Sequence, residues 1–219
     1  MRFSEAFNEM DSFIKNNLDS ITCNKIFQIK EDFYSIVQNL CGSTANLTGI
    51  TELLIFRFLY HSLGLTEKVE YKSAHNKTHS LFIGKRYIGS NGKIQEPDIV
   101  IEETNILKYL VSIKNVMSTV TPTKNEVESP LVQELIKENG VCTTAIQDIF
   151  RIKNIRYGPN NNFKSITVIF SDVPQRHRKA INLIHNKFNW HQFLILENNN
   201  KKFLNELNES LSLKIHKTV

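Results

Sequence analysis

The sequence predicts an α/β fold in which a mixed central sheet is flanked by helices. Short runs rich in Ile and Val in the middle of the chain have the length and composition of strands. The last third of the chain alternates such runs with helical segments, an order that favours parallel additions to a sheet. The expected order is α–β–β–β–α–β–α–β, preceded by two helices. With 219 residues, 41% of them hydrophobic, the chain is long enough for one sizeable core.

The N-terminal part of the chain predicts two amphipathic helices. Apolar residues recur with helical spacing over residues 3–18 and again over about 21–40, and Gly42 is a suitable stop. We expect residues 1–45 to form a helical extension packed on a core formed by residues 46–219, in a single globular unit. A partner surface is the alternative role for these two helices.

A third helix is predicted over residues 46–61, where Thr48 or Thr51 can provide the cap. This helix is apolar nearly all round, which indicates that it is buried. Glu52 in its first turn has two interpretations. It is either a carboxylate that favours the positive end of the helix dipole, or a carboxylate presented from a buried helix to the sheet.

The next residues predict an antiparallel meander of strands. A first strand is expected over residues 69–73 and a second over 81–88. Asn91-Gly92, within the polar segment 90–93, is a strong hairpin signal because both residues tolerate the positive φ angles of a tight turn.

Two strands follow, over residues 95–102 and 109–115, and Thr104-Asn105 between them predicts a second hairpin. Pro97 cannot donate to a sheet ladder, so we expect it at the start of its strand or at a bulge. These two strands hold the residues that most suggest chemistry.

Asp98 and Lys114 are an acid and a lysine on adjacent strands that are otherwise apolar. Because side chains alternate along a strand, Lys114 shares one face with Ser112. A lone lysine in such a place is costly unless it is paired. The pair therefore predicts a site, although a lysine at the end of a strand that reaches solvent is the simpler alternative.

The rest of the chain supplies a loop and the alternating elements. A polar loop follows Lys114 over residues 116–125, and its length is typical of functional or disordered loops. The helices and strands expected after it cover residues 129–135 (helix), 142–155 (helix), 165–170 (strand), 175–188 (helix), 193–196 (strand) and 202–213 (helix).

Composition excludes several classes of protein. The three cysteines, Cys23, Cys41 and Cys142, are far apart and odd in number, so disulfides and zinc clusters are not expected and a reducing, cytoplasmic location fits. The first residues lack the apolar core of a signal peptide, and no run is long enough to span a membrane. The seven histidines lack the spacing of a zinc site, and no glycine-rich nucleotide-binding motif occurs, so no nucleotide cofactor is expected.

Two features resemble the PD-(D/E)xK nuclease superfamily, which includes the type II restriction endonucleases. Pro97-Asp98 followed by Ser112-Ile113-Lys114 resembles its motif, with Ser112 where an acid is expected. The order of elements over residues 46–197 resembles the αβββαβ restriction-endonuclease-like core. Glu52 lies in a segment similar to the one with which many such nucleases place a glutamate on the helix before the first core strand.

The resemblance implies hydrolysis of phosphodiester bonds with Mg²⁺ as cofactor. Asp98 would be the bridging metal ligand and the backbone carbonyl of Ile113 an additional one. Lys114 would orient or deprotonate the attacking water and offset charge on the phosphorane. Ser112 can hold a water at the metal but supplies no charge.

The second carboxylate must therefore come from outside the motif. Glu52 is preferred. Glu128 is next, because some related enzymes combine Ser-x-Lys with a glutamate about fourteen residues further on, a spacing that Glu128 matches. Gln147 or Asp148 on the following helix is the third option. A dead site, marked by Ser112, is the remaining interpretation.

Double-stranded DNA is the expected substrate. The net charge of +5 and the pI of about 9.0 are compatible with phosphate binding. A type II restriction enzyme usually acts as a symmetric homodimer, so that two sites address two strands. A repair, junction-resolving or transposase-type nuclease of the same fold, and a catalytically silent DNA-binding or protein-interaction module, are the alternatives. The candidates for DNA contact are Lys85, Arg86, Asn115, Ser118, Thr119, Thr121, Lys124, Gln147 and Arg151.

Overall fold

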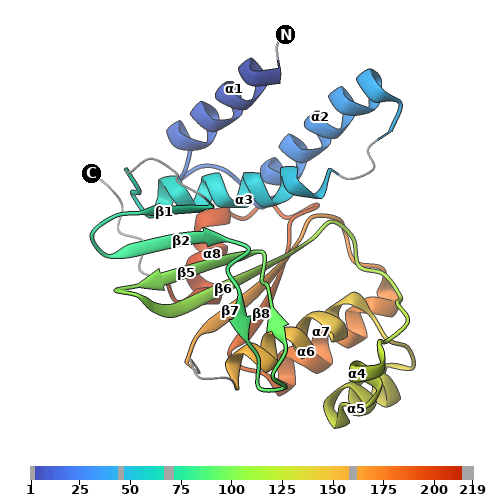
Figure 1. The fold of residues 1–219 in the computed structure, drawn as a ribbon. Helices are drawn as coiled ribbons and strands as arrows, with labels where there is room; N and C mark the ends of the chain where they lie inside the picture. The colour runs from blue at the N-terminus through green and yellow to red at the C-terminus, as the bar shows by residue number, and fades with distance from the viewer. Residues whose placement is uncertain (1–2, 44–46, 67–71, 158–161, 214–219) are drawn as a thin grey trace.

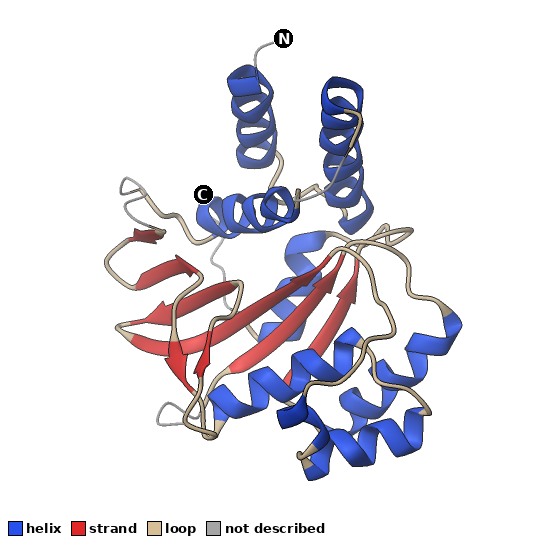
Figure 2. Ribbon diagram, turned by 45° about the vertical axis from the view of Figure 1, so that its right-hand side comes forward, coloured by secondary structure: helices blue, strands red, loops and turns tan. Residues whose placement is uncertain are grey.

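The computed structural model describes residues 3–43, 47–66, 72–157 and 162–213. It confirms an α/β fold with a mixed central sheet between layers of helices (Figure 1; Figure 2). The helices are α1 (Phe3–Asn16), α2 (Cys23–Cys41), α3 (Thr48–Ser62), α4 (Lys124–Val127), α5 (Pro130–Asn139), α6 (Thr144–Arg156), α7 (Gln175–Lys187) and α8 (Phe203–Leu211). The strands are β1 (Ser73–His75), β2 (His79–Ile83), β3 (Tyr87–Ile88), β4 (Ile94–Gln95), β5 (Ile99–Glu103), β6 (Ile106–Lys114), β7 (Lys164–Ile169) and β8 (His191–Ile195).

Six of these strands form the main sheet, in the order β1-β2-β5-β6-β7-β8. The first four pair antiparallel, as a meander does, whereas β6, β7 and β8 pair parallel. The parallel additions were expected from the strand–helix–strand order of the last third. The central strand β6 is therefore the one at which the antiparallel and parallel halves of the sheet meet.

The hairpin between β5 and β6 forms as its turn residues predict. Thr104 and Asn105 both have positive φ angles, 48° and 64°, as a two-residue turn of the primed type requires. The turn pairs Glu103 with Ile106, and an irregularity between Ile101 and Glu102 then shifts the register by one residue, so that Ile99 lies opposite Val111. Asp98 is the residue just before this first pair, and it therefore lies beside the end of β6.

The second expected strand, residues 81–88, is divided in the structure. β2 ends at Ile83, and the chain turns away from the main sheet at Gly84, whose φ of 60° favours glycine. It then forms the separate two-stranded hairpin β3–β4, with Gly92 at a φ of 72° in its turn. Of the first expected strand, residues 69–71 lie outside the described residues, and β1 begins at Ser73.

Helix α3 is buried, as its apolar sequence predicts: Leu54, Ile55 and Phe58 are each 0% exposed. The prediction of its cap was wrong. Leu47 occupies the N-cap position and makes no side-chain cap hydrogen bond, so neither Thr48 nor Thr51 is the capping residue. By contrast, Gly42 ends α2 in the left-handed conformation, as expected.

The two faces of the sheet are covered by different helices. Alternate strand residues such as Val111 and Ile113 point into an apolar core shared with α1, α2, α3 and α8. The residues between them face α6 and its neighbours, and α5, α6 and α7 pack together there (Figure 2). Helices α1 and α2 pack on α3 within the first core, while a domain boundary at residue 45 stays a prediction. None of the helices in the described part of the chain has the length and apolar character needed to cross a bilayer.

Candidate active site

Asp98 is held at the start of β5 by its backbone and its side chain. Its carbonyl accepts a hydrogen bond from the N–H of Gly84 at 3.1 Å. Its carboxylate Oδ2 accepts from the N–H of Ile113 at 2.5 Å. Asp98 precedes the first residue of β5. The N–H of Ile113 therefore binds this carboxylate and not the backbone carbonyl of a strand residue. The N–H and C=O of a strand residue point to the same side, so the carbonyl of Ile113 is directed toward Asp98 as well.

Lys114 and Ser112 share one face of β6, as their spacing predicts, and they touch each other. The Nζ of Lys114 donates to the Oγ of Ser112 at 3.0 Å and lies 3.0 Å from Oδ1 of Asp148. The Oγ of Ser112 lies 3.2 Å from Oδ2 of Asp98 and 2.9 Å from Oδ1 of Asp148. A hydroxyl has one hydrogen, so Ser112 donates to one of these two carboxylates at a time. The structure thus links the predicted acid and lysine through Ser112 and a second acid.

Asp148 is that second acid, and it is buried with only 2% of its surface exposed. Besides Ser112 and Lys114, it accepts hydrogen bonds from Arg151 at 2.9 Å and from Thr167 at 2.7 Å. Burial opposes ionisation of this carboxylate. The nearby charges of Lys114 and Arg151 outweigh that effect and hold its pKa well below the usual range.

The sequence interpretation ranked Asp148 behind Glu52 and Glu128, although a signal was present. Ala145 and Ile152 are buried residues of α6, and Asp148 lies on the same side of the helix, three residues after Ala145 and four before Ile152. An acid inside the apolar stripe of a helix is costly unless cations or donors meet it. That pattern marks Asp148 as a residue with partners on the sheet.

A line of polar side chains continues from Asp148 across the sheet. Thr167 on β7 is the parallel partner of Ser112 on β6, and it uses its one hydrogen on Asp148. The Nε2 of His191 lies 3.3 Å from the Oγ1 of Thr167, and its Nδ1 lies 2.8 Å from the Oγ of Ser165. Burial lowers the pKa of His191 to about 4, so its ring is neutral at pH 7. Nε2 therefore carries the proton and donates to Thr167, while Nδ1 accepts from Ser165. The sequence interpretation did not single out these three residues.

Glu52 and Asp98 are carboxylates whose pKa values are raised above their usual range. For Glu52 the causes are burial first and then the negative charge of Asp98, with Lys114 and Lys72 opposing. For Asp98 the causes are burial and the charge of Asp148, with Lys114 opposing. The negative charge of Asp98 thus reaches Glu52, and neighbouring carboxylates of this kind favour a bound cation. Glu52 is the fifth residue of α3 and lies beyond its first turn, which contains no acid, so the expected place in the first turn was wrong. It belongs instead to the electrostatic surroundings of Asp98 and Lys114.

The structure places Glu128 elsewhere. It lies at the C-cap of α4, its side chain is 61% exposed, and its ion pair is with Lys124 at 3.9 Å. The neighbouring Glu126 is buried instead. It caps α4 through the N–H of Thr123 and accepts from Gln147 at 2.9 Å. The spacing that suggested Glu128 as a ligand therefore corresponds to an exposed residue, and the acid joined to Lys114 comes from α6.

The expected DNA contacts fall into two groups. Several are engaged within the protein, so their polar atoms stabilise the fold around the site: Lys85 with Glu102, Arg86 with Glu96, Asn115 with Tyr34, Ser118 with Thr144, and Gln147 with Glu126. The others present exposed side chains: Thr119, Thr121, Lys124 and Arg151. Arg151 belongs to both groups, because it pairs with Asp148 while half of its side chain is exposed.

The site opens into a narrow crevice of about 20 Å³. Its lining includes Asp98, Ser112, Asp148 and Arg151, together with residues 95–97 that lead out of β4. A larger hollow of about 870 Å³ lies elsewhere, between α1 and the end of α3. Size alone would favour that hollow. The chemistry favours the crevice, because Asp98 and Asp148 both line it, together with the Ser112 that links them.

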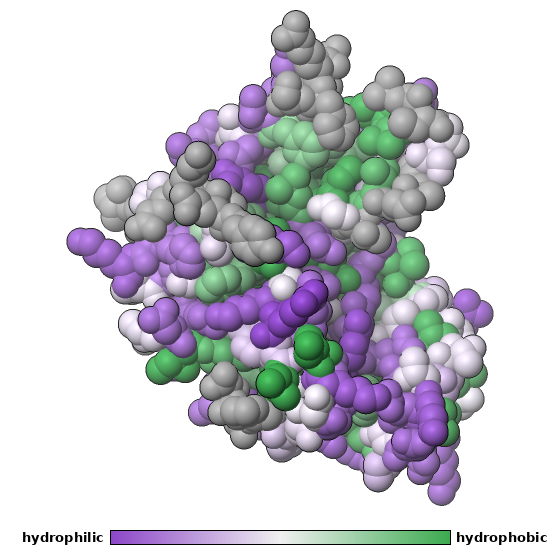
Figure 3. All heavy atoms as spheres, viewed as in Figure 1, coloured by the Kyte–Doolittle hydropathy of each residue, from purple (hydrophilic) through white to green (hydrophobic). Residues whose placement is uncertain are grey.

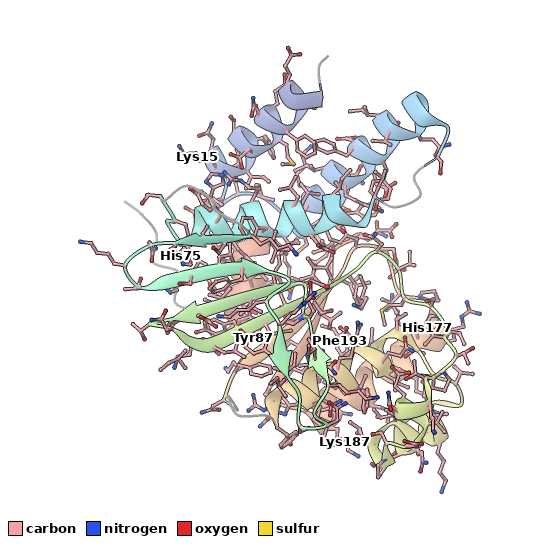
Figure 4. All side chains as sticks on the ribbon, in the orientation of Figure 1. Lys15, His75, Tyr87, His177, Lys187 and Phe193 are labelled. Carbon is pink, nitrogen blue, oxygen red and sulfur yellow. The ribbon has the colours of Figure 1, made fainter. Side chains whose placement is uncertain are left out.

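Residues 3–43, 47–66, 72–157 and 162–213 contain no group of three or more His, Cys, Asp or Glu side chains placed to hold a metal ion by themselves. The histidines are dispersed, and Figure 4 shows His75 and His177 on opposite sides of the molecule. A cation at Asp98 would therefore need a backbone carbonyl and solvent in addition to carboxylates, a donor set typical of Mg²⁺. Comparison with family models, with curated proteins and with solved structures yields no match.

Proposed function

We propose that this chain is a Mg²⁺-dependent endonuclease that hydrolyses phosphodiester bonds of double-stranded DNA. The observation that supports it best is the chain of contacts from Asp98 through Ser112 to Lys114 and Asp148. These residues come from the start of β5, the end of β6 and the middle of α6. The order of elements around them is compatible with a restriction-endonuclease-like core, and a sequence-specific enzyme of type II that acts as a homodimer is the form proposed.

The donors around Asp98 fit a hard divalent cation. Asp98 uses Oδ2 for its bonds to Ser112 and Ile113, which leaves Oδ1 to face a ligand. The carbonyl of Ile113 and the carboxylate of Glu52 would complete the protein ligands. Bound there, Mg²⁺ polarises a phosphoryl oxygen and lowers the pKa of an attacking water.

Lys114 supplies the positive charge of the site. Its ammonium group is fixed by Ser112 and Asp148, each at 3.0 Å, so its position is set before substrate arrives. A preorganised cation stabilises the negative charge that develops on a phosphorane. Asp148 thus acts as a positioning residue for Lys114, and Arg151 and Thr167 hold Asp148 in turn.

Cleavage of plasmid or phage DNA with Mg²⁺ tests this proposal. The wild-type protein should give discrete fragments, and Asp98→Ala and Lys114→Ala should abolish cutting while DNA binding persists. Asp172→Ala and Lys187→Ala are matched controls, because these residues form exposed ion pairs with Arg178 and Glu134. If the two site variants cut like wild type, the assignment of the site is wrong. Preference for branched or mismatched substrates would instead favour a repair or junction-resolving nuclease.

One observation favours a second candidate, a catalytically silent DNA-binding module. Ser112 replaces an acid, and both oxygens of Asp148 already accept hydrogen bonds within the protein. Only Asp98 and Glu52 are then left as charged ligands. Calorimetric titration with Mg²⁺ and Mn²⁺ distinguishes the two candidates. Absence of binding, even with DNA present, would favour the silent module.

A further inference from the structure

The hairpin β3–β4 presents two large apolar side chains to solvent. Ile88 and Ile94 are direct partners across the hairpin, so their side chains lie next to each other on one face. They are 66% and 64% exposed, which makes them the two most exposed large hydrophobic residues in the described part of the chain. Figure 3 shows two strongly hydrophobic side chains over this hairpin, surrounded by hydrophilic atoms.

The other face of the hairpin is anchored. Tyr87, labelled on β3 in Figure 4, packs against the core under α6 and donates to the buried carboxylate of Glu102 at 3.2 Å. At the turn, the N–H of Ser90 donates to the carbonyl of Asn154 on α6 at 2.8 Å. The hairpin is therefore fixed at its inner face and at its turn, and these contacts hold the side chains of Ile88 and Ile94 toward solvent.

The surroundings of this apolar pair favour a polyanion. Residues 84–97 contain three cations, Lys85, Arg86 and Lys93, and one acid, Glu96. Lys85 pairs with the buried Glu102, so Arg86 and Lys93 are the two exposed cations. Arg86 pairs with Glu96 at 3.0 Å, yet 72% of its side chain is exposed. Gln95 ends β4, and residues 96–97 lead from it to Asp98; all three line the crevice beside Asp98 and Asp148. At about 20 Å³ the crevice has room for a water and not for a phosphate. DNA whose phosphate approached Asp98 from outside the crevice would lie next to the hairpin.

We propose that the outer face of the hairpin β3–β4 is a contact surface for the DNA that approaches Asp98. Ile88 and Ile94 pack on deoxyribose and base surfaces, while Arg86 and Lys93 contact phosphates. This inference rests on the proposed function. A second copy of the chain is disfavoured as occupant, because two isoleucines supply little of the roughly 800 Å² per partner that a standard protein interface buries.

Binding of a labelled duplex, measured by fluorescence anisotropy with a chelator present so that no cutting occurs, tests the contact. The double variant Ile88→Ser with Ile94→Ser should bind about tenfold more weakly, since it loses two apolar contacts. The matched control is Ile106→Ser, a 57% exposed isoleucine at the opposite end of β6 from Lys114. This control should bind within about twofold of wild type.

The dependence of affinity on salt separates the two kinds of contact. Each phosphate contact contributes about 0.9 to the slope of log affinity against log salt concentration. Arg86→Gln and Lys93→Gln should each reduce that slope by about this amount. The isoleucine variant should weaken binding equally at every salt concentration and leave the slope unchanged.

Three results would overturn the inference. If wild type cuts DNA and the isoleucine variant binds DNA as tightly as wild type, the contact is wrong while the proposed function stands. If the isoleucine variant has a lower mass than wild type in sedimentation, the apolar pair is a contact between copies of the chain. If wild type neither binds nor cuts DNA, the proposed function fails and this inference with it. Circular dichroism verifies that each variant is folded.

Discussion

The Nζ of Lys114 lies 3.0 Å from Oδ1 of Asp148, an acid contributed by α6 and not by the strand that bears the lysine. The pair is almost enclosed, since the side chains are 16% and 3% exposed. In a nearly buried pair, each charge stabilises the ionised form of the other, because either charge alone would be poorly solvated. The packing of α6 on the sheet is therefore a condition for the charge state of the site.

Lys114→Met should destabilise the protein by about 2–4 kcal/mol, because it leaves Asp148 buried with Arg151 as its remaining cation. Combining it with Asp148→Asn should restore part of this loss, with a coupling energy above about 1 kcal/mol. Urea denaturation measures both. The control Lys187→Met removes an exposed pair with Glu134 and should cost less than about 1 kcal/mol. Equal losses for the two lysines would show that Asp148 does not depend on Lys114.

The stability that Asp148 contributes should disappear in acid. Its pKa is lowered on folding, so the unfolded chain binds more protons and the contribution is present above the ordinary pKa of aspartate. It is lost as the pH falls through and below that value, near 4. The difference in unfolding free energy between wild type and Asp148→Asn should therefore shrink between about pH 5 and pH 3. A difference that stays constant over this interval would contradict the assignment.

Asp98 should behave in the opposite way. Its pKa is raised on folding, so its ionised form opposes folding once the pH exceeds the raised value. Asp98→Asn should match wild type in stability in acid and exceed it at pH 7, within the range of about 0.5–2 kcal/mol that stabilising substitutions commonly give. The same variant should lower the pKa of Glu52, because Asp98 raises it. Thermal denaturation at two pH values, and NMR titration of Glu52, measure these effects.

The variants Glu52→Gln and Glu128→Gln should differ in the Mg²⁺ concentration that they require for DNA cleavage. Glu52 lies in the electrostatic surroundings of Asp98, whereas Glu128 is exposed beside Lys124. We expect Glu52→Gln to raise the Mg²⁺ concentration for half-maximal cutting by about tenfold or more, and Glu128→Gln to leave it unchanged. Titration of cleavage with Mg²⁺ provides the measurement. The reverse result would restore Glu128 as the second ligand.

Thr167→Val should affect the site through Asp148, and it also removes the acceptor of Nε2 of the buried His191. The substitution keeps the shape of the side chain but leaves Oδ2 of a buried carboxylate without its donor, at a cost of about 1–3 kcal/mol. Turnover should fall while the affinity for DNA stays the same, because Thr167 itself is fully buried. Thr66→Val, at an exposed position that is not a candidate for DNA contact, is the control. A loss of DNA affinity in Thr167→Val would indicate a wider disturbance.

Local signals in the sequence predicted most of the elements. The turn at Thr104-Asn105, the glycine after α2 and the Ser129-Pro130 start of α5 each appear where their residue types favour them. The prediction of the N-cap of α3 failed because more than one residue was a suitable N-cap. Two threonines could cap α3, yet its first turn is preceded by Leu47, and nothing local distinguishes these options.

The site was predictable only as far as it lies on one hairpin. Asp98, Ser112 and Lys114 are brought together by the pairing of β5 with β6, which the turn at Thr104-Asn105 predicts, although the one-residue register shift between Ile101 and Glu102 was not predicted. Asp148 depends on how α6 docks on the sheet, a tertiary contact that spacing along the chain does not encode. Glu128 shows the converse, since a suitable spacing gave an exposed residue.

Helix α6 joins two features of the molecule mechanically. It holds Asp148 near its middle and Asn154 about 9 Å further along, where the turn of the hairpin β3–β4 is hydrogen-bonded. A helix of this length is stiff. A displacement of the hairpin β3–β4 at Asn154 would therefore also displace Asp148, the carboxylate that fixes Lys114.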